Sequence, residues 1–136
     1  PGGTAEAVHH TALTVLVEGL IDLGLLCGDA DGVIERGDYR HLYMHRTGHW
    51  LGLDVHDVGA YRLGEKPADL CEGMVLTVEP GLYVSDRLAV PEGQPPIEDR
   101  WKGIGIRIED DVAVVNGGCE VMTAAALKSV AAMERR

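Results

Sequence analysis

The β-strand pattern of this chain is clearest in two stretches, Gly73-Met-Val-Leu-Thr-Val-Glu79-Pro-Gly81 and Gly103-Ile-Gly-Ile-Arg-Ile-Glu109. In both, apolar residues recur at every second position, which is the period of a β-strand. Pro80-Gly81 ends the first strand. Asp110-Asp111 predicts a turn after the second, followed by a return strand over residues 112–115 and another turn at residues 116–118.

Helical patterns flank these strands. Apolar residues at helical spacing predict a helix between Thr4, a plausible N-cap, and Gly24, a plausible stop. Residues 27–41 predict a short helical turn at best, and the proline-containing polar segment 85–100 predicts a long loop at a functional rim. Thr123 predicts the cap of a closing alanine-rich helix. Helices that flank antiparallel strands place the chain in the α+β class.

Histidines concentrate in one string, His41-Leu-Tyr-Met-His45-Arg-Thr-Gly-His49-Trp-Leu-Gly-Leu-Asp-Val-His56-Asp57, which holds four of the six. The alternation after Gly48 predicts a loop that leads into a strand over residues 51–55. Histidine carries protons and binds metals near neutral pH. The alternative is a set of surface or core histidines without chemistry. Asp54 and Asp57 flank His56 and either orient its ring or lie in a solvated loop.

Two glutamates, Glu79 and Glu109, each end an otherwise apolar strand. A buried carboxylate is costly unless it is paired, hydrogen-bonded or bound to a metal. The alternative for both is that they mark where a strand emerges into water. Arg107 lies two residues before Glu109 on the same strand face, where it can pair with Glu109 or with a neighbouring acid.

One histidine and two strand-borne glutamates form a ligand set of nitrogen and oxygen atoms. Such a set suits Mn²⁺, Fe²⁺, Co²⁺ or Zn²⁺. Three ligands can hold one catalytic ion and leave a position open for water. A pair of ions would require further ligands from outside this chain.

Composition narrows the class of protein. The chain has 136 residues, the size of one domain, and its 46% hydrophobic and 25% charged residues exclude a disordered class. A formal charge of −10 argues against a nucleic-acid binder and against an anionic membrane surface as partner. No apolar run is long enough to predict a membrane-spanning helix, and no signal-peptide pattern opens the chain.

The cysteine pattern and the first residue bear on compartment and completeness. Cys27, Cys71 and Cys119 are odd in number and widely spaced, which argues against a disulfide framework and favours a reducing compartment, so we expect a cytoplasmic protein. The chain begins with Pro1 rather than Met, which predicts a processed, trimmed or partial chain.

Three ordered motifs over residues 39–116 resemble aminopeptidase P (Xaa-Pro aminopeptidase). They are the string from His45 to Asp57, Gly73-Met-Val-Leu-Thr-Val-Glu79-Pro-Gly-Leu-Tyr83, and Gly103-Ile-Gly-Ile-Arg107-Ile-Glu109-Asp-Asp. This family belongs to the pita-bread metallopeptidases, with prolidase and methionine aminopeptidase. The resemblance implies the second half of a pita-bread fold, an antiparallel sheet with flanking helices. Residues 1–136 are then the C-terminal half of a catalytic domain whose upstream half is absent.

The resemblance also implies a role for each matching residue. His49, Glu79 and Glu109 match the metal ligands, with Glu109 bridging two ions, and Glu79 matches the acceptor of the proton from the attacking water. His45 and His56 match histidines that hold the substrate and stabilise the tetrahedral intermediate. Tyr83 matches a residue near the proline pocket, and Arg107 matches an arginine that pairs with a metal-binding aspartate. The family's usual ions are two Mn²⁺, with Zn²⁺ or Co²⁺ as other occupants.

The implied reaction is metal-dependent release of the first residue from peptides with proline in second position. The family's site also needs two aspartates and one more histidine from the upstream half, so we expect the isolated chain to be inactive. At full length we expect a homo-oligomer. Two alternatives remain at this point: prolidase, which cleaves Xaa-Pro dipeptides, and an inactive pita-bread module that serves as a binding or scaffold domain.

Overall fold

The computed structural model describes residues 1–135. The chain divides into two compact units. Unit 1 consists of Pro1–Ala5, Gly48–Glu79 and the segment from Ile108 onward, and unit 2 consists of Glu6–Thr47 and Pro80–Arg107.

Unit 2 is built on the long helix α1 (Ala5–Asp22). The helix begins after Thr4 and ends before Gly24, whose φ of 71° is a backbone conformation that glycine adopts without strain. The predicted helix is therefore confirmed. The buried face of α1 packs against side chains from later parts of the chain to form the core of unit 2. The buried core residues are Leu13, Val17, Leu20, Leu25, Leu26, Val33, Leu42, Tyr43 and Val84.

The segment after α1 holds more helix than the sequence predicted. Helix α2 (Ala30–Arg36) is followed by the 3₁₀ helix η1 (Asp38–His41). The Asp29 carboxylate accepts the N–H of Gly32 at the start of α2, and Gly37 ends the helix with a φ of 74°. These two caps stabilise a helix of only seven residues, which is too short for periodicity to reveal.

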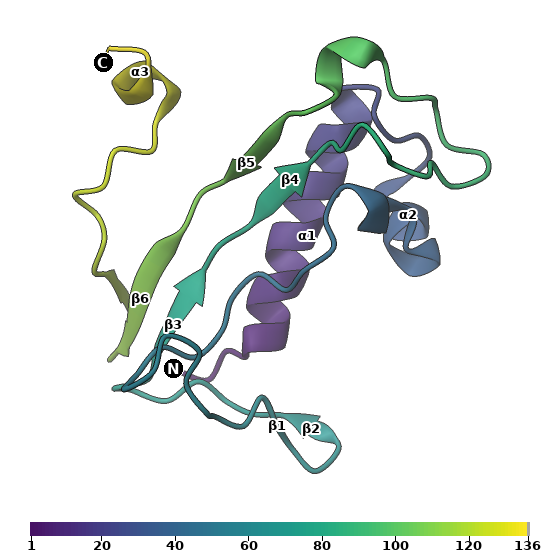
Figure 1. The fold of residues 1–136 in the computed structure, drawn as a ribbon. Helices are drawn as coiled ribbons and strands as arrows, with labels where there is room; N and C mark the ends of the chain where they lie inside the picture. Colours follow the sequence, from purple (N-terminus) through teal and green to yellow (C-terminus); the bar gives the residue numbers. More distant parts are fainter. Residues whose placement is uncertain (136) are drawn as a thin grey trace. The chain divides into compact units, whose positions relative to one another are not determined.

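Strands β4 (Gly81–Tyr83) and β5 (Gly105–Arg107) form an antiparallel pair in unit 2. Gly81 pairs with Arg107 and Tyr83 with Gly105. Figure 1 shows this ribbon alongside α1, and Leu82 packs against the core that α1 builds. A long loop leads from β4 to the 3₁₀ helix η2 (Asp99–Trp101), as the proline-containing segment predicted.

Unit 1 contains a three-stranded antiparallel sheet in the order β3-β6-β7. Its strands are β3 (Val75–Val78), β6 (Asp110–Val115) and β7 (Gly118–Val121). Strands β3 and β6 run side by side in Figure 1, with Val78 opposite Asp110. Asn116-Gly117 joins β6 to β7, and Gly117 has a φ of 78°, so the predicted turn there is confirmed. Unit 1 also contains two short strands, β1 (Arg62–Leu63) and β2 (Lys66–Pro67), which pair with each other in antiparallel fashion.

Two sequence-based predictions about strands are wrong. Asp110 and Asp111 do not form a turn but open β6, which pairs with β3 and β7, whereas β5 pairs with β4. Residues 51–55 form a loop rather than a strand, in which Leu53 is 102% and Val55 69% exposed. An alternating pattern predicts a strand only where one set of side chains is buried, and here neither set is.

The predicted closing helix is also wrong for most of its length. Only α3 (Val130–Met133) is helical, with Ser129 as its N-cap, and residues 122–125 form turns. Thr123 caps no helix: its hydroxyl accepts the N–H of Asp111 and donates to Asp110. Lys128 also contacts Asp110, and these two partners hold the pKa of that carboxyl below its usual range. The C-terminal segment is thus fastened to the start of β6.

Two further observations concern the chain as a whole. Among residues 1–135, no helix combines the length and the apolar character needed to cross a lipid bilayer. Cys27, Cys71 and Cys119 are exposed free thiols.

Candidate functional site

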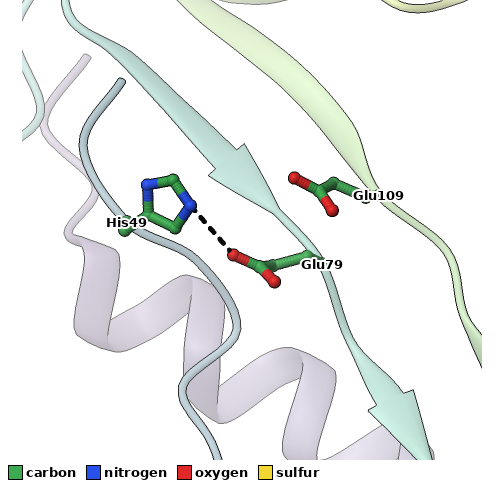
Figure 2. Close-up of side chains that lie close together, drawn as sticks. All are labelled: His49, Glu79 and Glu109. Atoms are coloured by element: carbon green, nitrogen blue, oxygen red, sulfur yellow. Dashed lines mark ion pairs between the residues drawn. The ribbon is translucent and has the colours of Figure 1, made fainter. Parts of the chain in front are cut away.

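Three side chains from separate parts of the sequence meet in unit 1. His49, Glu79 and Glu109 each offer one ligand atom, and these atoms all lie within 4.8 Å of one another. Figure 2 shows Glu79 directed toward the ring of His49, with Glu109 beside it. His49 is half-buried, Glu79 is buried and Glu109 is exposed. The sequence predicted this set, and the structure brings its members together.

Glu79 directly follows β3, which fixes where its side chain points. Its Oε1 atom accepts a hydrogen bond from the hydroxyl of Thr77 over 3.0 Å and lies 3.3 Å from Nε2 of His49. Glu79 is only 7% exposed, so its partners decide whether its charge is tolerated. A glutamate that only marks where a strand emerges into water would be exposed, so that alternative does not apply to Glu79.

His49 is held beside β3 by its backbone. Its N–H donates to Thr77 Oγ1 over 3.0 Å, and its carbonyl accepts the N–H of Thr77 over 2.9 Å. A Cβ atom on Gly48 would lie 1.9 Å from the carbonyl oxygen of Thr77, so this close approach requires glycine at position 48. The segment before His49 can therefore lie directly against β3.

The ring of His49 presents a lone pair to the two glutamates. Nδ1 lies 2.9 Å from the carbonyl oxygen of Trp50, which can only accept, so Nδ1 carries the proton. Nε2 is then free of its proton in the neutral ring and faces Glu79. A hydrogen bond from Nδ1–H to a backbone carbonyl is the arrangement that orients metal-binding histidines.

The donor set fits a divalent ion of the first transition row. Zn²⁺ binds His nitrogen and carboxylate oxygen at about 2.0–2.2 Å, so two donors of one ion lie at most about 4.4 Å apart. The present separations, within 4.8 Å, need to close by only a few tenths of an ångström. One imidazole with two carboxylates suits Mn²⁺, Fe²⁺, Co²⁺ or Zn²⁺.

His56 lies beside His49 in unit 1. The two ring centroids are 4.4 Å apart and the planes meet at 68°. The loop that carries His56 is closed by Asp57, whose carboxylate accepts the N–H groups of Leu53 and Val58 and whose own N–H donates to the carbonyl of Trp50. Asp57 therefore shapes the backbone of a largely exposed loop, which agrees with the loop role considered from the sequence.

A second cluster lies in unit 2 and contains His45, Tyr83 and Arg107. Nε2 of His45 is 2.9 Å from the hydroxyl of Tyr83, and that hydroxyl accepts the Nε–H of Arg107 over 2.7 Å. Arg107 Nη2 also lies 3.2 Å from Nε2 of His45. Nδ1 of His45 donates to the carbonyl of Arg46 over 2.7 Å, so Nε2 is the acceptor. The hydroxyl of Tyr83 therefore accepts a hydrogen bond from Arg107 and donates one to His45.

Two residues that shape the three-ligand cluster of His49, Glu79 and Glu109 are not predicted from the sequence. Thr77 contacts both His49 and Glu79, and Gly48 allows the two backbone segments to approach. The available signal for Thr77 was a single hydroxyl in an otherwise apolar strand, two residues before Glu79 and therefore on the same strand face. The sequence around Gly48 indicates only a loop.

Comparison with known proteins identifies similar sequences. The family described as metallopeptidase family M24 matches residues 1–116. The Xaa-Pro aminopeptidase of Haemophilus influenzae is 45% identical over 135 residues, which cover 98% of this chain and 29% of that relative. The chain thus spans less than a third of the relative's length.

Solved structures give the same result for the fold. An aminopeptidase of Pseudomonas aeruginosa superposes with a TM-score of 0.90 at 47% identity, covering 99% of this chain and 29% of that one. Aminopeptidase P from Escherichia coli with the inhibitor Pro-Leu gives a TM-score of 0.79 at 42% identity, with coverages of 98% and 30%. The predicted resemblance and the predicted α+β half of a pita-bread fold are confirmed.

Proposed function

Since the chain belongs to metallopeptidase family M24, we propose that it is the C-terminal half of the catalytic domain of a Xaa-Pro aminopeptidase. The reaction is hydrolysis that releases the first residue from peptides with proline in second position. Similarity to an H. influenzae enzyme of that name supports this substrate class. The observation that carries the proposal is the convergence of His49, Glu79 and Glu109, from three separate stretches, on one point.

His49, Glu79 and Glu109 are the proposed metal ligands. Three ligands suffice for one ion, and we propose that an upstream half, with two aspartates and a further histidine, completes a site for two ions. Mn²⁺ is the proposed occupant, with Zn²⁺ or Co²⁺ as substitutes. When bound, such ions would supply positive charge that lowers the pKa of a nearby water and offsets the charge of the oxyanion.

Glu79 is the proposed acceptor of the proton from the attacking water. Its Oε1 atom accepts a hydrogen bond from Thr77 and lies 3.3 Å from Nε2 of His49. Its position among the proposed metal ligands supports this proposal, because a general base must lie within reach of the proton that it takes.

The cluster of His45, Tyr83 and Arg107 is the proposed substrate-binding part of unit 2. The three side chains are already connected by hydrogen bonds, so their positions are set before a peptide arrives. Tyr83 is proposed to lie near the proline ring, which has no N–H to satisfy and a fixed φ. Arg107 is also proposed to pair with a metal-binding aspartate from the upstream half.

His56 is the proposed second histidine that holds the substrate and stabilises the tetrahedral intermediate. Its ring packs against that of His49, which supports a position next to the proposed metal ligands. We further propose a cytoplasmic protein that forms homo-oligomers at full length. The three exposed free thiols support a reducing compartment.

Metal binding by the chain tests the ligand assignment directly. Titration calorimetry with MnCl₂ should show weak binding to the chain alone and tight binding once the upstream half is joined to it. His49→Ala should abolish binding in both forms, while His10→Ala, a histidine on the exposed face of α1, should leave it unchanged. Equal Mn²⁺ affinity of wild type and His49→Ala would overturn the assignment.

Peptide assays of the extended protein then separate the candidate activities. Release of the first residue from Xaa-Pro-Xaa tripeptides, but not from Xaa-Ala-Xaa tripeptides, is the expected result. Cleavage of Xaa-Pro dipeptides only would indicate a prolidase. Tight Mn²⁺ binding without cleavage of either substrate would indicate a scaffold module.

A further inference from the structure

The side chains of His9, Tyr43 and Thr47 form a chain of hydrogen bonds, and two of them come from the segment that carries His45. The hydroxyl of Thr47 lies 2.6 Å from the hydroxyl of Tyr43 and 2.8 Å from Nδ1 of His9. Thr47 is 2% and Tyr43 1% exposed, so the first of these bonds lies fully in the interior of unit 2. His9 comes from α1, 38 residues away along the chain. One buried hydroxyl thus joins the segment to the helix.

The chemistry of the three groups allows both bonds to form at the same time. Burial lowers the pKa of His9, and neighbouring cationic groups act in the same sense: Arg46, His10 and His45. A neutral ring can accept at Nδ1, and a threonine hydroxyl has a single proton to donate. With the lone pair of Nδ1 facing Thr47, Thr47 donates to His9 and accepts from Tyr43; with the proton on Nδ1, both bonds run in the opposite direction. In either arrangement the Thr47 hydroxyl is used once as donor and once as acceptor.

His45 lies in sequence between the two segment residues of this chain, Tyr43 and Thr47. The ring of Tyr43 meets that of His45 edge-on, with centroids 5.1 Å apart. On its other side the His45 ring meets Tyr83 at a centroid distance of 5.4 Å and through the 2.9 Å hydrogen bond. The ring of His45 is therefore held between two tyrosines, one of which is fixed by Thr47.

We propose that His9 and Thr47 are positioning residues, which act through Tyr43 to hold the ring of His45 against Tyr83 and Arg107. This inference rests on the proposed function, in which His45 binds the substrate. Neither His9 nor Thr47 contacts the reacting atoms. Their role is to fix one rotamer of a neighbour that does.

Packing alone does not account for these polar groups. Position 47 is among apolar core residues, where valine would have nearly the same shape as threonine without a hydroxyl to satisfy. A buried polar group costs free energy unless it is bonded, and fully bonded sets of this kind specify one arrangement of a core. The observed set specifies the arrangement of the segment that bears His45.

The test compares Thr47→Val with Thr47→Ser, which keeps the hydroxyl, and uses Thr11→Val on the exposed face of α1 as the matched control. In the chain joined to its upstream half, Thr47→Val should lower kcat/KM on Xaa-Pro-Xaa peptides about tenfold, because misplaced binding groups cost at least that much. Thr47→Ser and Thr11→Val should stay within about twofold.

A readout independent of activity uses the ring of His45 in the chain itself. In nitrogen-15 NMR, Nε2 of His45 should shift in Thr47→Val and in His9→Gln, and it should keep its wild-type position in Thr47→Ser. If Thr47→Val does not fold, His9→Gln carries both measurements. Unchanged His45 signals in a folded variant would overturn the inference.

His45→Ala distinguishes failure of the inference from failure of the proposed function. If His45→Ala leaves peptide hydrolysis unchanged, the proposed role of His45 is wrong, and the NMR result alone decides the positioning role. If His45→Ala weakens hydrolysis and Thr47→Val does not, the proposed function stands and the positioning role is wrong.

Discussion

The hydroxyl of Thr77 donates a hydrogen bond to Glu79 Oε1 over 3.0 Å. The oxygen of that hydroxyl, Thr77 Oγ1, accepts the backbone N–H of His49, also over 3.0 Å. Two members of the three-ligand cluster therefore depend on one buried hydroxyl from the interior of β3. This relationship makes Thr77 the first residue to test.

Thr77→Val should weaken Mn²⁺ binding by about tenfold or more, because residues that orient metal ligands affect affinity by that amount. It should also lower the free energy of unfolding by ~1–2 kcal/mol, since the N–H of His49 loses its partner. Thr77→Ser keeps the hydroxyl and is the control. Calorimetry and urea unfolding measure the two effects, and equal affinities of Thr77→Val and wild type would contradict the role of Thr77.

Gly48→Ala should destabilise the chain by about 2 kcal/mol or more, since its Cβ would lie 1.9 Å from the carbonyl oxygen of Thr77 and the backbone would have to move. Gly19→Ala is the contrasting variant. It lies within α1 with nothing within 4 Å of the added Cβ, and it should stabilise the chain by roughly 0.5–1 kcal/mol. Urea unfolding of both variants should give shifts of opposite sign.

Gln94 should fasten the long loop between β4 and η2. Its side chain accepts the N–H of Cys27 over 2.8 Å, and its amide group donates to the carbonyl of Cys27 and to Asp38 over 3.2 and 2.9 Å. Gln94→Ala removes all three bonds, so proteolytic cleavage within residues 85–98 should become about tenfold faster. Ser85→Ala at the start of the loop is the control, and equal cleavage of wild type and Gln94→Ala would contradict the assignment.

Stability should fall as the solution is acidified below pH 6.5, the unperturbed value for histidine. Burial lowers the pKa of His9 and of His41 in the folded chain, so the unfolded chain binds more protons in this range. The stability that depends on His9 and His41 being neutral is complete above pH 6.5 and is lost as the pH falls from there toward their pKa values in the folded chain. Urea unfolding between pH 8 and pH 5 should show a smaller decline in His9→Gln than in wild type. Identical declines would contradict this.

Local pattern was sufficient for the elements whose alternation coincides with one buried face. Strand β6 is such an element, since it buries Val112 and Val114, two positions apart on one face. Strand β3 differs, because its two buried residues, Leu76 and Thr77, are adjacent and lie on opposite faces. The same periodicity gives the wrong prediction at residues 51–55, because the carboxylate of Asp57 closes a loop there by accepting the N–H groups of Leu53 and Val58. That loop is shaped by bonds between one side chain and the backbone, which an alternation of apolar residues does not reveal.

The candidate site was predicted where residue type carries the chemistry. His49, Glu79 and Glu109 stand out because histidine and strand-borne carboxylates are unusual in apolar surroundings. Gly48 and His9 do not stand out, and Thr77 does so only as a hydroxyl in an apolar strand, because the importance of all three lies in what they contact across 28 to 38 residues of chain. Such contacts arise only when the backbone has folded, and a single sequence does not encode them in any local pattern.

The structure of the loop closed by Asp57 also predicts which of its positions tolerate substitution. Its shape depends on one carboxylate and on glycines that leave room for neighbours: a Cβ on Gly52 would meet Asp57 at 1.9 Å, and one on Gly59 would meet Trp50 at 2.3 Å. The side chains of Leu53 and Val58 contribute almost nothing to it, because these residues are 102% and 93% exposed. Saturation mutagenesis across this loop should therefore find tolerance for polar residues at positions 53 and 58, next to near-invariance at positions 52, 57 and 59.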